Sequence, residues 1–410
     1  MNTAGIPERA GPLSYRPYAY FWYSRLAATL AMQIQVVAVG WQIYELTGSA
    51  LDLGLVGLVQ FAPSVLLLFV VGPIVDRGNR RTILALCRLS NAIATLALAV
   101  ASVNGWLTRE ALFVFVFALG AARAFEMPAG QALLPTLVPS TMLPRAIALA
   151  SSAIQAATIV GPAIGGFLYV AGPHVVYASA AAMYLVGAVT MLWVQDRREP
   201  GSLPQVSVRY LFAGIGFIRR HPILLGAISL DMVAVLLGGA TALLPIYARD
   251  ILMTGPWGLG LLRSAPGVGA LVMALWLSRR PPQRRVGRAL LGSVALFGVA
   301  TLVFGVSRSL PLSLCALVVL GAADMVSVVI RMSLVQLETP DAMRGRVGAV
   351  NSVFIGASNQ IGEFESGAVA AWLGVVASVV IGGVGTLLVV ALWARLFPEL
   401  ARRDQLAPRS

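Results

Sequence analysis

Twelve long apolar runs constrain this chain more than any other feature. Each run approaches or exceeds the roughly 20 mostly apolar residues that a helix needs to cross a bilayer. The first six runs cover roughly 18–44, 52–75, 82–103, 110–128, 146–171 and 174–194, and the second six cover roughly 223–247, 256–278, 287–306, 311–333, 346–372 and 375–397. The pattern predicts an all-α integral membrane protein with twelve transmembrane helices.

The composition agrees with a chain that is embedded in a lipid bilayer. Only 11% of the residues are charged, which is less than half of the roughly 25% found in soluble domains. All 30 basic residues are arginine, and the net charge is +13. The arginines occur in short groups between the apolar runs rather than on one polar domain. This distribution is typical of membrane loops and argues against a nucleic-acid-binding protein.

The two halves of the chain repeat each other. The segment Leu119–Arg123 reads Leu-Gly-Ala-Ala-Arg, and 201 residues later Leu320–Asp324 reads Leu-Gly-Ala-Ala-Asp. The matched pieces have the same predicted direction across the membrane, so the repeat is parallel. The sequence therefore predicts an N-terminal six-helix half in 1–195, a polar cytoplasmic linker in 196–222 and a C-terminal six-helix half in 223–410.

Arginine is distributed unevenly between the two sides of the predicted membrane. The loops of one side hold most of the arginines, including those within 77–81, 279–288 and 344–346, and the loops of the other side hold few. Cytoplasmic loops carry the excess of basic residues in membrane proteins. Both termini and the linker are therefore expected in the cytoplasm, which agrees with an even number of spans.

A motif lies between the second and third runs. The sequence Gly-Pro-Ile-Val-Asp-Arg-Gly-Asn-Arg-Arg at 72–81 resembles the G-x-x-x-D-R-x-G-R-R/K signature of the major facilitator superfamily. The resemblance implies a cytoplasmic gate motif made of Gly72, Asp76, Arg77, Arg80 and Arg81. The sequence departs from the signature at Asn79, so Gly78 is expected to supply the turn. The alternative is a basic loop that only sets topology.

A second motif lies in the fifth run. The sequence from Ala157 to Gly166 resembles the G-x-x-x-G-P-x-x-G-G motif of drug–proton antiporters in the same superfamily, with alanine at the first glycine. The matching positions are Gly161, Pro162, Gly165 and Gly166. The physical content of the motif is close helix approach at the small residues and a bend at the proline. The alternative is ordinary packing of small residues between helices.

Three further segments resemble one branch of the superfamily. These are Ser24–Leu26, Gln131–Pro135 and Met343–Val347, and they are similar to the branch that contains bacterial enterobactin exporters. The resemblance implies the major facilitator fold, a bacterial inner-membrane location and outward movement of a siderophore or a related amphipathic compound. Arg123 and Glu126 resemble part of a fourth-helix motif, with glutamate where that motif has glutamine.

Several polar residues within the runs are candidates for the transport site, because ionisable groups in spans are costly and usually face a cavity. Glu363 lies on one helical stripe with Asn359, and it is the first candidate for proton coupling, followed by Asp231 and Asp324. The cavity candidates are Arg123, Glu126, Gln33, Gln35 and Asn359. Structural ion pairs or core hydrogen bonds are the alternatives. For Arg25 and Arg331, which lie near predicted helix ends, the alternative is snorkelling.

The function that follows is secondary transport. We expect a proton-driven exporter that works by alternating access, with a proton-coupled uptake symporter as the alternative. Cys87 and Cys315 lie within apolar runs, and His174 and His221 are isolated, so neither a catalytic site nor a metal centre is expected. No phosphate loop for ATP is present in the sequence. The expected partners are a small-molecule substrate, protons and the lipid bilayer, with no cofactor and a monomeric chain.

Overall fold

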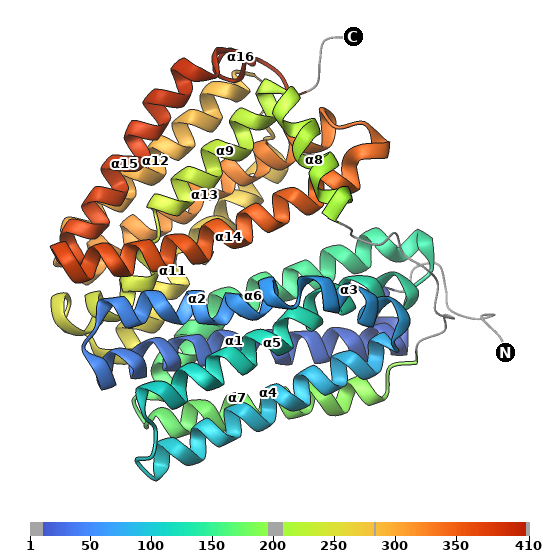
Figure 1. Cartoon of the computed structure of the whole chain (residues 1–410), viewed down its shortest axis with the longest axis vertical. Coiled ribbons are helices and arrows are strands. Elements are labelled where there is room, and N and C mark those ends of the chain that lie inside the picture. Colours follow the sequence, from blue (N-terminus) through green and yellow to red (C-terminus); the bar gives the residue numbers. More distant parts are fainter. Residues whose placement is uncertain (1–10, 196–207, 283, 407–410) are drawn as a thin grey trace. The chain divides into compact units, whose positions relative to one another are not determined.

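The computed structural model describes residues 11–195, 208–282 and 284–406, and their regular structure consists of helices without a strand (Figure 1). The helices that lie in the first six runs are α1 (Arg16–Thr47), α2 (Ala50–Leu66), α3 (Leu68–Arg77), α4 (Arg80–Val103), α5 (Arg109–Leu133), α6 (Leu143–Tyr169) and α7 (Pro173–Leu192). Those that follow are α8 (Val208–Arg220), α9 (Pro222–Leu237), α10 (Leu244–Ile246), α11 (Gly255–Arg279), α12 (Val286–Val306), α13 (Leu310–Leu337), α14 (Asp341–Leu373), α15 (Val375–Leu396) and α16 (Pro398–Ala401).

Each of the twelve apolar runs contains a helix, but not every run is one plain span. Among the described residues, ten helices are long and apolar enough to cross a membrane, and there are eleven if α2 and α3, which are bent by 63° relative to each other, count as one span. The remaining run lies in α14, which carries five charged residues and does not meet the same criterion. The run at 223–247 is also interrupted, because α9 ends before Gly238 and a π-helix at Tyr247–Ile251 completes the span.

The chain forms two compact units. Unit 1 comprises Met1–Gln42 and Val59–Gln205, and unit 2 comprises Ile43–Leu58 and Val206–Ser410. The end of α1 and the start of α2 therefore belong to unit 2. The first part of the predicted linker, 196–207, lies outside the described residues, while its remainder forms α8 and a short connection to α9.

The packing within the units repeats as the sequence does. In unit 1, α4 packs against both α5 and α7, and in unit 2 the corresponding helix α12 packs against both α13 and α15. Figure 1 shows the α4–α7 pair and the α12–α15 pair as neighbours. The repeated Leu-Gly-Ala-Ala segment lies within α5 and α13, and its small residues allow another helix to pack closely against each of them. Gly120 touches the backbone of Gln60, and Gly321 touches the backbone of Pro266, so a Cβ at either glycine would clash with main-chain atoms. Close backbone contact of this kind is a common basis of helix packing in membranes.

The amphipathic helix α8 packs on unit 2 through its apolar face. Ile218 is buried in a cluster with Leu224, Val335, Val347 and other apolar side chains from α9, α13 and α14. Gly214 lies against the backbone oxygen of Arg346, where a Cβ would stand 2.7 Å away. The segment that reads as a polar linker thus continues the fold of unit 2.

Candidate transport and coupling site

A buried ion pair joins two helices of unit 1. The side chain of Arg88, on α4, is 2% exposed, and its Nε lies 3.1 Å from the Oε1 of Glu126 on α5. Arg88 also donates a hydrogen bond to the hydroxyl of Ser24, and the sulfur of Met191 lies 3.7 Å from its Nη1. A buried charge without a partner is costly, so these contacts explain how an arginine is accommodated inside an apolar run.

The sequence indicated Glu126 as a cavity residue but not its partner. Arg88 interrupts the run 82–103, and that interruption was the available signal. The other two arginines of this region are less buried. Arg25 is half-buried with its guanidinium 5.9 Å from the ring centre of Phe21, and Arg123 is exposed. Neither forms an ion pair with another described residue of the chain, so unit 1 carries surplus positive charge near Glu126.

The glutamines of α1 take up different roles. Gln33 donates from Nε2 to the hydroxyl of Thr158 on α6 at 3.1 Å. Gln42 accepts from the hydroxyl of Tyr177 at 2.6 Å, which is core hydrogen bonding. Gln35 is 4% exposed, and its Nε2 has no partner among the described residues. Gln35 is thus the glutamine with an unused buried donor.

The antiporter-like motif of α6 marks a close helix contact in unit 1. A Cβ at Gly161 would stand 2.5 Å from the Cβ of Gln33, and one at Gly165 would stand 2.7 Å from the backbone oxygen of Ile34. Pro162 lies within α6, which continues through it. Close approach to α1 is the physical content expected of this motif.

A second buried ion pair joins two helices of unit 2. Arg331, on α13, places Nη1 3.0 Å from Oδ2 of Asp231 on α9, and the two side chains are only 4% and 7% exposed. Arg331 is therefore a buried, paired residue and not a snorkelling one. Its Nε has no hydrogen-bond partner among the described residues, so the pair leaves part of the guanidinium available.

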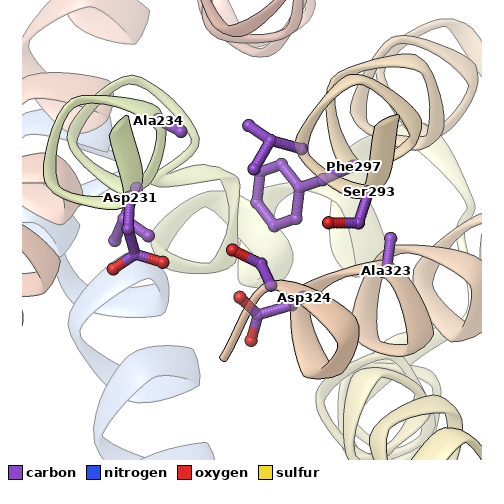
Figure 2. Close-up of a pocket in the computed structure, with 9 residues that line it drawn as sticks. Asp231, Ala234, Ser293, Phe297, Ala323 and Asp324 are labelled. Carbon is purple, nitrogen blue, oxygen red and sulfur yellow. The ribbon is translucent and has the colours of Figure 1, made fainter. Parts of the chain in front are cut away.

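A second carboxyl group lies in the same region. Asp231 and Asp324 line one pocket of unit 2 together with Ser293 of α12 and Ser327 of α13. The pocket is narrow, with a volume of about 10 Å³ that leaves room for about one water molecule, and Phe297 forms part of its wall. Figure 2 shows the carboxyl group of Asp324 and the hydroxyl of Ser293 pointing into this space. Two acids thus share the site with one arginine.

The region around Glu363 is a tight helix contact within unit 2. The backbone of Glu363 and Phe364 lies against Gly54, and a Cβ at Gly57 would stand 2.5 Å from Oε2 of Glu363. Glu363 also interacts electrostatically with Arg263 of α11. Asn359, one turn earlier, is exposed and donates to the backbone oxygen of Ile355 at 2.9 Å. Only small residues on α2 allow the carboxyl group this position.

The gate motif forms the junction between α3 and α4. Gly78 closes α3 by donating its N–H to the oxygen of Ile74, but with φ −85° it does not adopt the left-handed conformation that a glycine turn would use. Asn79 is the N-cap of α4, since its side chain accepts from the N–H of Thr82 at 3.2 Å. The departure from the superfamily signature thus places a favourable capping residue at the helix start.

The arginines of the motif bind the ends of neighbouring helices in unit 1. Arg80 is buried and donates to the backbone oxygen of Ala132 at 3.1 Å, and Arg81 donates to that of Leu192. Arg77 is exposed and Asp76 is half-buried. Two of the three arginines therefore hold helix ends, which a loop that only set topology would not need.

Asp76→Asn tests the gate proposal. The change keeps the size of the side chain and removes the charge with which Asp76 is expected to bind neighbouring helix ends in the outward-open state. Transport is expected to fall while the amount of protein in the membrane stays unchanged. Arg77→Gln, at the exposed arginine, is the matched comparison. Unaltered transport by Asp76→Asn would leave the motif with a topological role alone.

The comparisons with known proteins agree with this architecture. A family model described as "Transmembrane secretion effector" matches residues 9–409. The chain belongs to this family of the major facilitator superfamily. The enterobactin exporter EntS of Shigella boydii is 26% identical over 391 residues, which are 94% of this chain and 93% of that protein. The protein of the same name from Escherichia coli O1:K1 is 25% identical over the same shares.

Solved transporters share the fold. A bacterial homologue of the human lysosomal transporter Spinster, in an inward-facing and occupied conformation, has a TM-score of 0.73 at 15% identity, covering 94% of this chain and 98% of its own. A bacterial homologue of the iron transporter ferroportin has a TM-score of 0.72 at 15% identity, covering 95% and 99%. The family match and this shared fold together make the chain a multi-pass transporter of the major facilitator fold rather than an enzyme.

Proposed function

We propose that this chain exports a siderophore or a similarly amphipathic compound across the bacterial inner membrane, by alternating access and in exchange for protons. The family and the curated relatives named as enterobactin exporters support the substrate class and the direction. The observation that carries the coupling is the pocket of unit 2, which is lined by Asp231 and Asp324, while the one arginine nearby, Arg331, pairs with Asp231.

The charge balance of this pocket favours proton exchange. Arg331 is paired with Asp231 at 3.0 Å, so Asp324 is the surplus acid. An unpaired carboxylate in a water-poor span is costly, and taking up a proton removes that cost. Among the three coupling candidates, Asp324 is therefore supported by the geometry, while Asp231 holds the arginine and Glu363 lies at a helix contact.

The surplus positive charge of unit 1 is suited to binding the substrate that is exchanged for protons. Arg123 is exposed and Arg25 is half-buried, and neither is neutralised by an ion pair among the described residues. Guanidinium groups recognise oxygen acceptors on planar or anionic groups. We place substrate recognition in unit 1 at Arg123 and Glu126, with Gln33 and Gln35 as further contacts.

A transport assay in inside-out vesicles tests the proposal. Vesicles from cells that produce the chain, with an acidic interior, are expected to accumulate radiolabelled enterobactin, and a protonophore should abolish the accumulation. Vesicles without the chain are the control. Loss of preloaded enterobactin from these vesicles under the same gradient would favour the uptake symporter. No gradient-dependent movement in either direction would contradict the proposal.

The orientation is part of the same proposal. Basic loops are retained on the cytoplasmic side, so the linker around Arg209 is placed inside and the loop around Gly255 outside. In a background without Cys87 and Cys315, a cysteine at 255 is expected to react with an impermeant thiol reagent on intact cells, and a cysteine at 209 only after permeabilisation. The reverse labelling pattern would overturn the orientation.

A further inference from the structure

The pocket between α9, α12 and α13 is built from more oxygen ligands than proton uptake requires. Asp324 and Ser327 lie on α13, Ser293 lies on α12 and Asp231 lies on α9, and all four line the same space. A proton needs a single carboxyl group, whereas a hard cation needs several oxygen ligands around one point. Proton exchange therefore does not explain why the two serine hydroxyls line the pocket.

The serine hydroxyls are free to act as ligands. Ser293 donates its proton to the backbone oxygen of Leu290 at 2.8 Å, so its lone pairs are left to face the pocket. Ser327 is 3% exposed, and its Oγ has no hydrogen-bond partner among the described residues. A buried polar atom without a partner is costly. A cation bound in the pocket would satisfy Ser327 and accept the lone pairs of Ser293 at the same time.

The net charge selects the valence of the ion. The charged groups that face the pocket are Asp231 and Asp324, with Arg331 paired to Asp231. Together they carry one negative charge, and α12 faces the space only with Ser293, Val294 and Phe297. One monovalent cation makes the site neutral, while a divalent ion would leave a positive charge in the span, which is unfavourable. The narrow space favours the smaller of the common alkali ions.

We propose that this pocket of unit 2 is a sodium-binding site, ligated by the Asp324 carboxylate and the hydroxyls of Ser293 and Ser327. Arg331 holds Asp231 at the edge of the site and so leaves one carboxylate for the ion. Because sodium and a proton would use the same carboxylate, each excludes the other. The inference goes beyond the proposed function and does not depend on the transported substrate.

Equilibrium binding of ²²Na⁺ to the purified full-length chain in detergent tests the site, with choline as the replacing ion. We expect saturable binding that unlabelled sodium displaces, that calcium does not displace, and that weakens as the pH falls because protons occupy Asp324. Asp324→Asn should abolish binding. Ser327→Ala, which removes only one oxygen, should weaken it about tenfold or more, as loss of a supporting group does at other ion sites.

Matched controls separate the site from general effects. Ser358→Ala removes a buried hydroxyl that bonds to its own helix, and Glu365→Gln removes a half-buried acid of α14. Both variants should bind sodium as the unmodified chain does. Absence of saturable sodium binding, or full binding by both Asp324→Asn and Ser327→Ala, would overturn the proposal. Sodium binding by a chain that fails to move enterobactin would reject the proposed function alone, and transport without sodium binding would reject this inference alone.

Discussion

We expect the Arg331→Met variant to give only a small yield of folded protein. The change leaves Asp231, 7% exposed, buried without its partner on α13. Breaking a buried pair in this way costs about 3–5 kcal/mol, which is a large share of the 5–15 kcal/mol that stabilises a typical protein. The measurement is the monodisperse yield of a fluorescently tagged chain on size exclusion, together with its melting temperature.

Two comparisons make this prediction specific. Arg344→Met breaks an exposed ion pair, in which the side chain of Arg344 is 54% exposed and that of Asp341 is 87% exposed. This change should lower the free energy of unfolding by no more than about 1 kcal/mol. The double variant Asp231→Asn with Arg331→Met removes both charges and should recover much of the yield. If Arg331→Met is as stable as Arg344→Met, the buried pair does not hold α9 to α13.

Asp324→Asn is expected to abolish proton-driven net export. Export against a gradient needs a group that binds a proton in one state and releases it in the other. The amide resembles the protonated acid at all pH values, so exchange of substrate down its own gradient should persist while coupling is lost. Both modes can be measured with labelled enterobactin in the same vesicles, with and without an imposed gradient.

Glu363→Gln and Asp231→Asn complete this series. Glu363 touches α2 at Gly57 and acts on Arg263, so its neutralisation should reduce the amount or rate of transport without changing its pH dependence. Asp231→Asn leaves Arg331 to pair with Asp324 and should shift the pH dependence. Full pH-dependent export by Asp324→Asn, together with its loss in Glu363→Gln, would assign the coupling to Glu363 instead.

The spans and the repeat were readable from the sequence because apolar length and internal identity are local properties of the chain. The Leu-Gly-Ala-Ala segments even mark close helix contacts, since Gly120 and Gly321 both touch a backbone. The family model and the solved folds confirm the predicted major facilitator fold. The residues of the transport and coupling site stay predictions.

The pairing of the buried charges was not readable. Helical periodicity places Asp324, Ser327 and Arg331 on one stripe of α13 at steps of three and four residues, but it does not say that Asp231 of α9 meets that stripe. Arg88 was passed over for the same reason, because its partner Glu126 is 38 residues away on another helix. The role of Asn79 as a helix cap was not readable either, because it depends on α4 beginning at Arg80, which the signature does not indicate.

The polarity of α14 has a consequence for how this chain enters the membrane during synthesis. A charged residue near the centre of a segment costs about 2.5–3.5 kcal/mol at the translocon, and α14 carries Glu363 and Glu365 within its apolar run. The next helix, α15, is the most apolar of the spans and packs against α14 across a single glycine, Gly374. The two helices are thus suited to insert together as a hairpin, with α15 supplying the apolar surface that carries its partner into the bilayer.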